Sequence, residues 1–163
     1  MVTWRRVTTP LGEVTIVADD DWLTELHLPG DAAVVPADAV EGGPTVDRAA
    51  AQLPEWFAGE RRHFDLPLAP VGTAFQRRVW AVLVSVPYGE TATYGDIAAA
   101  IGQPTATRAV GAANGRNPIP LIIPCHRVIG SNGALVGYSG GGGVATKRYL
   151  LDVEQGVLTL DVP

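Results

Sequence analysis

The order of apolar and polar positions predicts a strand-rich first part of the chain. In the first thirty residues, short runs of β-branched, aromatic and polar residues are separated at Pro10-Leu11-Gly12 and at the acidic stretch Asp19–Asp21. Such runs, with turn residues between them, are typical of a β-meander. Residues 29–45 are rich in Pro, Gly and Ala, so we expect a loop there.

The next segment predicts one helix followed by an extended linker. Thr45 can cap a helix that runs to Glu60, although Pro54 should bend or interrupt it because proline lacks a backbone N–H. Residues 63–72 are typical of a strand that leads into a linker, and we place a domain boundary near Pro70. The expected domains are residues 1–70, which are β-rich, and residues 71–163.

Helical periodicity dominates the second part. Thr73 can cap a helix over residues 74–87, because apolar side chains recur there at helical spacing on one face. These side chains are Phe75, Val79, Trp80, Leu83 and Val86.

Two shorter helices follow and predict a helix-turn-helix. The first begins with the capping-box pattern Thr93-x-x-Asp96 and ends at Gly102. The second has Pro104 in its first turn and stops at Asn114-Gly115. Two short helices joined by a glycine-containing turn fit a DNA-reading element. The small residues of the second helix favour either close approach to DNA, with Arg108 projecting, or tight helix packing, and the sequence leaves both open.

Composition restricts the class of protein without identifying it. The 163 residues, 47% hydrophobic and 18% charged, suffice for one substantial domain or two small ones. No apolar run approaches the ~18 residues of a membrane-spanning helix. The N-terminus also lacks the apolar stretch and cleavage site of a secretory signal. A single cysteine fits a reducing compartment, so we expect a cytoplasmic location.

Charge is distributed unevenly along the chain. Residues 1–70 hold five Arg and twelve acidic residues, a net charge of −7. Residues 71–150 hold seven basic and two acidic residues, a net charge of +5, and the last thirteen residues contribute −3. A polyanion such as DNA would be repelled by the first part and attracted by the second.

The single cysteine, Cys125, lies in "IIPCHRVIG" beside His126. A free thiol has a pKa of about 8.5 and reacts only as a stabilised thiolate. In an extended segment adjacent side chains point to opposite faces, so proton transfer to His126 would need a bridging water or a turn. Arg127 adds positive potential nearby, and the surrounding prolines stiffen the segment. Taken alone, the pattern is more typical of a buried structural cysteine than of a nucleophile.

Residues 117–141, "NPIPLIIPCHRVIGSNGALVGYSGG", resemble the active-site segment of the O6-alkylguanine-DNA alkyltransferases, which are suicide DNA-repair proteins. The upstream motifs "FQRRVW", "VPYGETATYGDIA" and "TRAVGAANG" stand in the family order, and "KRYLLDVEQG" resembles the family's closing helix. The resemblance is dense from Phe75 to Glu154 and looser before it. It implies an α+β fold of two domains. The first is a small β-meander of ribonuclease-H-like type, and the second is helical with a winged-helix-like helix-turn-helix.

The resemblance assigns a role to each matching residue. Cys125 would be the alkyl acceptor, His126 would take the thiol proton through a water, and Glu154 would orient His126. Asn117 would brace the turn before the active-site segment, and Tyr94 would stabilise or protonate the departing guanine.

The remaining roles concern contacts with the guanine and with DNA. Arg108 would fill the gap that the flipped nucleotide leaves in the base stack. The guanine edge would be framed by Cys125, Val128, Tyr138 and Ser139. The positions that would touch DNA are Gln103, Ala106, Thr107, Arg108, Gly111 and Ser131.

The activity implied is direct and irreversible transfer of a methyl or other alkyl group from O6-alkylguanine in duplex DNA to Cys125. O4-alkylthymine is a second candidate substrate. Each molecule would act once, as a methylated-DNA–[protein]-cysteine S-methyltransferase, with no cofactor and with DNA as its partner. We expect a monomer in solution and no membrane association, and leave cooperative assembly on DNA open.

Two departures from the family pattern limit the resemblance. "YSGGGGVATKRYLL" carries about two extra residues before the last helix, so the preferred alkyl group is left open. The N-terminal part lacks the Cys and His ligands that some relatives use for zinc. Because only Cys125, His27 and His63 remain besides His126, we predict no metal site.

Two other classes of protein compete with the repair enzyme. One is a damage-binding module that keeps the fold without the chemistry, and the retained Cys125, His126 and Glu154 speak against it. The other is a cysteine hydrolase, whose nucleophile and histidine are usually far apart in sequence and which needs an oxyanion hole. The adjacent Cys125 and His126 and the expected helix-turn-helix disfavour it.

Overall fold

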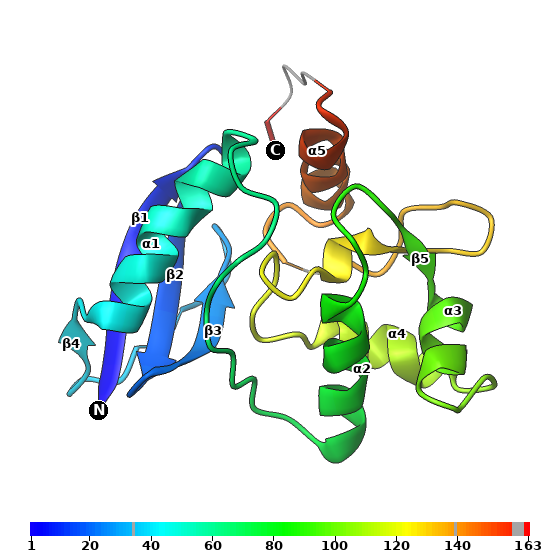
Figure 1. The fold of residues 1–163 in the computed structure, drawn as a ribbon, viewed down its shortest axis with the longest axis horizontal. Helices are drawn as coiled ribbons and strands as arrows, with labels where there is room; N and C mark the ends of the chain where they lie inside the picture. Colours follow the sequence, from blue (N-terminus) through cyan, green and yellow to red (C-terminus); the bar gives the residue numbers. More distant parts are fainter. Residues whose placement is uncertain (34, 139, 158–161) are drawn as a thin grey trace.

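The first part of the protein is a four-stranded sheet, shown in Figure 1 at the left. The computed structural model describes residues 1–33, 35–138, 140–157 and 162–163. Strand β1 (Val2–Thr9) pairs antiparallel with β2 (Gly12–Asp19), which pairs antiparallel with β3 (Trp22–His27). A short strand, β4 (Val40–Glu41), pairs parallel with β1, so the order is β3-β2-β1-β4. The predicted meander and both of its turns are confirmed.

Helix α1 (Pro44–Phe57) covers one face of this sheet (Figure 1). The predicted cap is wrong, and the interruption that was one of the two expected effects of Pro54 does not occur. The Thr45 hydroxyl donates to the Asp21 carbonyl at 3.0 Å instead of capping the helix, which begins one residue earlier. The helix also continues through Pro54, because its buried face packs against the sheet and outweighs the ~3 kcal/mol cost of an internal proline.

The second part is mainly helical. Helix α2 (Ala74–Val84) begins with the predicted Thr73 cap, whose hydroxyl accepts from the Gln76 N–H at 3.1 Å. It buries Val79, Trp80 and Leu83 on one face.

Helices α3 (Tyr94–Ala100) and α4 (Thr107–Gly115) form the predicted pair and pack against each other and against α2. The Thr93–Asp96 capping box is present at the start of α3. Pro104 is not in the first turn of α4, because Ala106 is the residue that precedes the helix. It lies instead in the turn between the two helices.

Short elements then lead to the last helix. The 3-10 helix η1 (Cys125–Arg127) is followed by β6 (Val128–Ile129), which pairs parallel with β5 (Ala92–Thr93). Helix α5 (Val144–Gln155) ends at Gly156, whose φ of 70° is the left-handed conformation common after a helix. The observed architecture is an α+β fold.

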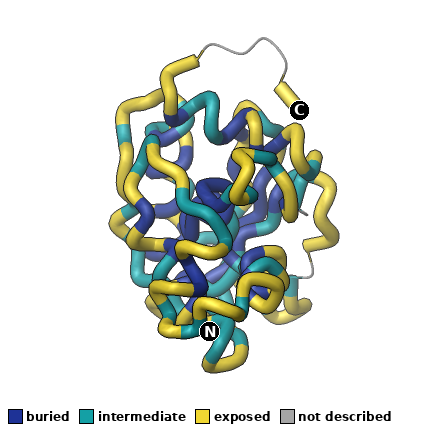
Figure 2. Tube along the Cα trace, turned by 90° about the vertical axis from the view of Figure 1, so that its right-hand side faces the viewer, coloured by how far each residue is buried: buried dark blue, intermediate teal, exposed yellow. Residues whose placement is uncertain are grey.

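The two parts share one hydrophobic core. Figure 2 shows buried positions throughout the interior, and the core cluster contains residues of both parts. The edge strand β3 joins them through its backbone, because the Leu26 N–H donates to the Pro118 carbonyl at 2.9 Å. Since Pro118 lies in the loop before Cys125, the sheet holds the start of the active-site segment in place.

Candidate active site

Cys125 is the first residue of η1, so the backbone turns at this point. The sequence alone is compatible with either an extended segment or a turn here. The Cys125 N–H donates to the Ile123 carbonyl and the Arg127 N–H to the Pro124 carbonyl, at 2.8 and 3.0 Å. Asn117 holds the loop before it. Its side chain donates to the Ile123 carbonyl at 2.8 Å and accepts from the Ile119 N–H at 2.9 Å.

His126, the residue after Cys125, is paired with the carboxylate of Glu154, and both side chains are fully buried. His126 Nε2 lies 2.6 Å from Glu154 Oε2, which α5 supplies. Nδ1 is therefore the ring nitrogen left to take a proton, and it has no hydrogen-bond partner among the described residues. Trp56 of α1 packs edge-on against the imidazole, with the ring centroids 6.1 Å apart, so the N-terminal part fixes one side of the histidine.

Its position in the sequence predicts that Arg127 adds positive potential near Cys125. In the structure its guanidinium is instead paired with the carboxylate of Glu154. Its Nε donates to both oxygens of Glu154 at 3.0 Å, and its Nη1 donates to the Val86 carbonyl at 2.7 Å. The Gly89 N–H also donates to Glu154 Oε1 at 3.0 Å. Burial alone would raise the pKa of Glu154, but the hydrogen bonds from His126 and Arg127 lower it to about 2. Glu154 is thus an anion at neutral pH.

Burial also determines the protonation of the nucleophile and the base. Cys125 is 4% exposed, and burial raises the pKa of its thiol against the opposing effects of an Asn117 hydrogen bond and the Lys147 charge. Burial lowers the pKa of His126, although Glu154 opposes this. A protonated thiol and a neutral imidazole are the reactants of a general-base step.

A buried lysine that the sequence did not single out lies under Tyr94. The Tyr94 hydroxyl and the Lys147 ammonium both donate to the Val136 carbonyl at 2.8 Å, and Lys147 Nζ lies 5.8 Å from the centre of the Tyr94 ring. Burial lowers the pKa of Lys147 to about 8, and the nearby Cys125 raises it. Lys147 and Arg148 are adjacent charged residues near the start of the last helix. In the sequence, only the position of Lys147 in the helical repeat indicates that its side chain is buried.

Of the positions expected to touch DNA, Thr107, Arg108 and Gly111 lie on α4, Gln103 and Ala106 lie in the turn before it, and Ser131 lies in the loop after β6. Thr107, Arg108 and Ser131 are exposed, and Gln103, Ala106 and Gly111 are partly buried. Ala113 of α4 is buried and α4 packs against α2 and α3, whereas a Cβ on Gly111 would make only an ordinary contact with the Tyr94 ring at 3.9 Å. Small residues of α4 therefore serve helix packing, one of the two readings left open, while Arg108 projects from the exposed side.

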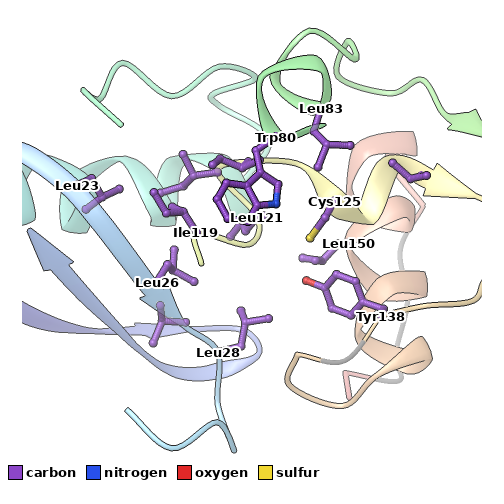
Figure 3. Packing of buried hydrophobic residues seen from close by; sticks show 14 of the residues in the cluster. Leu23, Leu26, Leu28, Trp80, Leu83, Ile119, Leu121, Cys125, Tyr138 and Leu150 are labelled. Carbon is purple, nitrogen blue, oxygen red and sulfur yellow. The ribbon is translucent and has the colours of Figure 1, made fainter. Parts of the chain in front are cut away.

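The remaining predicted site residues are close to Cys125 or outside the described structure. Val128 is fully buried directly after η1, and Tyr138 is 8% exposed. The Tyr138 hydroxyl has no hydrogen-bond partner in the described part of the chain. Figure 3 shows the Cys125 sulfur and this hydroxyl directed toward the same space, across from Leu26 and Leu28. Ser139 lies outside the described residues.

A cavity of about 600 Å³ opens beside the thiol, within the ~300–1,000 Å³ typical of small-molecule sites. Cys125, Asn114, Asn117, Pro120 and Tyr138 line it from the C-terminal part. Its other wall comes from the N-terminal part and includes Glu25, His27 and Asp31, which sequence reasoning missed. Nothing in the meander pattern indicated that one edge strand faces the cysteine.

The described residues contain no group of three or more His, Cys, Asp or Glu side chains that could hold a metal ion. In the same residues, every helix is too short or too polar to cross a membrane.

Comparisons with known proteins agree with this geometry. Residues 74–156 match the family described as "6-O-methylguanine DNA methyltransferase, DNA binding domain". The chain is 47% identical over 152 residues to the constitutive methylated-DNA–protein-cysteine methyltransferase of Bacillus subtilis, which covers 90% of this chain and 92% of that protein. It is 45% identical over 161 residues to the Mycobacterium tuberculosis protein of that name, covering 95% and 93%.

Solved structures show the same likeness. The O6-methylguanine methyltransferase of Mycobacterium tuberculosis superposes with a TM-score of 0.85 at 44% identity, over 99% of this chain and 97% of that one. The OGT of the same organism, solved in complex with DNA, superposes with a TM-score of 0.85 at 42% identity, over 94% and 93%.

Proposed function

The chain belongs to the O6-methylguanine-DNA methyltransferase family, and we propose that it repairs duplex DNA by moving an alkyl group from guanine O6 to its own Cys125. The observation that carries this proposal is the arrangement of the single thiol. It lies on a rigid turn, at the wall of a cavity and next to a buried His126–Glu154 pair. A purely structural cysteine needs neither the cavity nor the base.

The chemistry is an in-line displacement at the alkyl carbon. The sulfur–carbon bond forms as the bond from that carbon to O6 breaks, and the guanine leaves with the electron pair. His126 Nδ1 takes the thiol proton through a water, and Glu154 stabilises the imidazolium that results. The departing guanine gains a proton, for which the Tyr94 hydroxyl is the proposed donor.

The product explains why each molecule acts once. A thioether at Cys125 is stable, and no second thiol exists in the chain to displace the alkyl group. Transfer therefore consumes the protein and requires no cofactor as alkyl donor, because the alkylated base supplies the group. O4-alkylthymine remains a second candidate substrate, since it offers a similar carbon–oxygen bond.

Reaching a buried sulfur requires the nucleotide to leave the duplex. Rotation of a base out of the stack costs a few kcal/mol, and least for a damaged pair. Arg108 projects from α4 and is the proposed side chain that occupies the vacated position. The other proposed DNA contacts are Gln103, Ala106, Thr107, Gly111 and Ser131.

The proposal also covers the division of the chain into domains and its location in the cell. The sheet with α1 would form one domain to residue 70, and residues 71–163 would form the DNA-binding and alkyl-acceptor domain. The ribonuclease-H-like description of the first domain, the cytoplasmic location and the monomeric state remain predictions. The +5 charge of residues 71–150 supports DNA as the partner of the second domain.

The test is an intact-mass measurement after incubation with duplex DNA that holds O6-methylguanine. We expect each protein molecule to gain the mass of one methylene unit, a proton being replaced by methyl, and Cys125→Ala to gain none. Tight binding to the damaged duplex with unchanged protein mass would support the damage-binding module instead. Release of methanol with unchanged protein mass would support a hydrolase.

A further inference from the structure

Trp56 brings the N-terminal part of the chain into contact with the catalytic base. This tryptophan lies near the end of α1 and is fully buried. Phe57 and Phe64 contact its ring, with centroids 5.0 and 6.5 Å away. Tyr88 and His126 contact it edge-on, with centroids 6.2 and 6.1 Å away. These four neighbours restrict the orientation of the indole beside the imidazole.

Two nitrogens of these touching rings, Trp56 Nε1 and His126 Nδ1, are buried without a hydrogen-bond partner in the described residues. The indole Nε1–H can only donate a hydrogen bond. In the neutral imidazole Nδ1 can only accept one, because Nε2 carries the proton and donates it to the ionised Glu154 at 2.6 Å. Buried polar groups that the protein leaves unpaired are usually satisfied by buried water. One water can satisfy a donor and an acceptor on neighbouring rings.

We propose that Trp56 is a positioning residue of the proton relay, and that its Nε1–H holds the water through which His126 deprotonates Cys125. The inference rests on the proposed alkyl transfer and adds a residue of the N-terminal part to it. A water oxygen can accept two hydrogen bonds. One comes from Trp56, so the other position is free for the thiol proton, while one hydrogen of the water points at Nδ1.

Each proton in this step has a destination. The water passes a proton to His126 Nδ1 as it accepts the proton of the Cys125 thiol, so a neutral water molecule remains. The sulfur keeps its electron pair for the attack on the alkyl carbon. Trp56 gives up no proton. Its N–H stabilises the hydroxide character that the water acquires during the transfer, because hydrogen bonds to a group that gains charge are stronger than neutral ones.

A crystal structure of the wild-type protein that shows ordered water tests this position directly. We expect one water within about 3.2 Å of both Trp56 Nε1 and His126 Nδ1. A water bound to Nδ1 without contact to Trp56 would overturn the assignment. An indole N–H that lies against the imidazole face with no water between them would also overturn it. This observation requires no catalysis, so it is independent of the proposed function, which a wild-type protein that transfers no methyl would contradict.

A kinetic test uses Trp56→Phe, which keeps an aromatic ring but removes the N–H, with Trp80→Phe as the matched control. Trp80 is also buried, but its Nε1 already donates to the Ala113 carbonyl at 2.9 Å. Single-turnover methyl transfer is measured with saturating duplex from pH 7 to 9.5. We expect Trp56→Phe to be about tenfold slower than wild type at pH 7, roughly the effect of one hydrogen bond. The deficit should shrink as the pH rises, because a growing share of thiols then ionises without the base.

The ratio of the wild-type rate to the variant rate separates the relay from other titrations. Glu154, Arg127 and Lys147 are the charged groups that act on His126, and both variants retain them. Lys147, with a pKa of about 8, titrates in every protein compared, so its effect cancels in the ratio. Any loss of rate in Trp80→Phe should be the same at each pH. A Trp56→Phe deficit that is absent, that does not change with pH, or that Trp80→Phe reproduces would overturn the role in proton transfer.

Discussion

Replacement of Glu154 by glutamine tests the buried cluster that supports Cys125. The substitution keeps the shape of the side chain but removes its charge, so Arg127 is left buried without a counter-ion. A pKa lowered from 4.5 to about 2 corresponds to about 3 kcal/mol of stability at neutral pH. Breaking a buried ion pair costs about 3–5 kcal/mol, which agrees. We therefore expect Glu154→Gln to lower the free energy of unfolding by about 3–5 kcal/mol at pH 7.

The pH dependence gives the sign of the effect. The folded-state pKa of Glu154 is below its unfolded value, so the unfolded state binds more protons between pH 2 and 4.5. The contribution is complete above about pH 4.5 and is lost as the pH falls toward 2. The difference between wild type and Glu154→Gln should therefore shrink over that range.

Urea unfolding at several pH values measures this difference. At pH 7 we expect the midpoint to fall by about 1–5 M, given a slope of about 1–3 kcal/mol per molar urea. Glu55→Gln is the matched control, because Glu55 pairs with Arg61 at 3.2 Å but is 41% exposed, so its loss should cost no more than about 1 kcal/mol. Equal losses for the two variants, or a Glu154→Gln effect that does not vary from pH 2 to 5, would refute the reasoning.

Three further predictions follow from single residues. Arg108→Ala should slow transfer from duplex substrate by about tenfold or more while affecting the free O6-alkylguanine base much less, and equal losses on both would remove the proposed stack-filling role. Because burial raises the pKa of the Cys125 thiol, neutral iodoacetamide should modify it more slowly than a free cysteine at pH 7, with a rate that rises with pH, whereas a rate that is flat from pH 6 to 8 would indicate a preformed thiolate. Lys147→Met should raise the free energy of unfolding at pH 7 by about 1–3 kcal/mol, since a pKa lowered to about 8 means that folding disfavours the charged lysine at every pH below 8. The same variant should slow alkyl transfer, because the Lys147 charge lowers the pKa of the Cys125 thiol. Lower stability in urea would contradict the stated cost of the buried charge.

Local signals were sufficient for much of the fold. The two turns of the meander and the caps at Thr73 and Thr93 depend on side chains within a few residues, so they could be predicted. The predicted cap at Thr45 and the interruption expected at Pro54 are absent for a tertiary reason. The partner of Thr45 is the distant Asp21 carbonyl, and Pro54 is tolerated because α1 is packed on the sheet.

The candidate site likewise contains residues that could be predicted from the sequence and residues that could not. Cys125, His126 and Glu154 could be proposed because family motifs mark them. The environment of Lys147 and the paired role of Arg127 could not, since Lys147 contacts Val136 and Tyr94 and Arg127 binds Glu154 of α5, and all of these partners are distant in sequence. The wall formed by Glu25 and Asp31 depends on contact between residues far apart in the sequence, which no local pattern records.

Peptide mapping after a single turnover tests the central claim most directly. Trypsin cleavage after Arg116 and Arg127 releases residues 117–127, the segment that holds Cys125. After incubation with an excess of duplex O6-methylguanine, we predict that this peptide gains one methylene unit in essentially every molecule, with fragment ions that place it on Cys125. Loss of the methyl group from the DNA without modification of this peptide, or methylation of any other residue, would contradict the account.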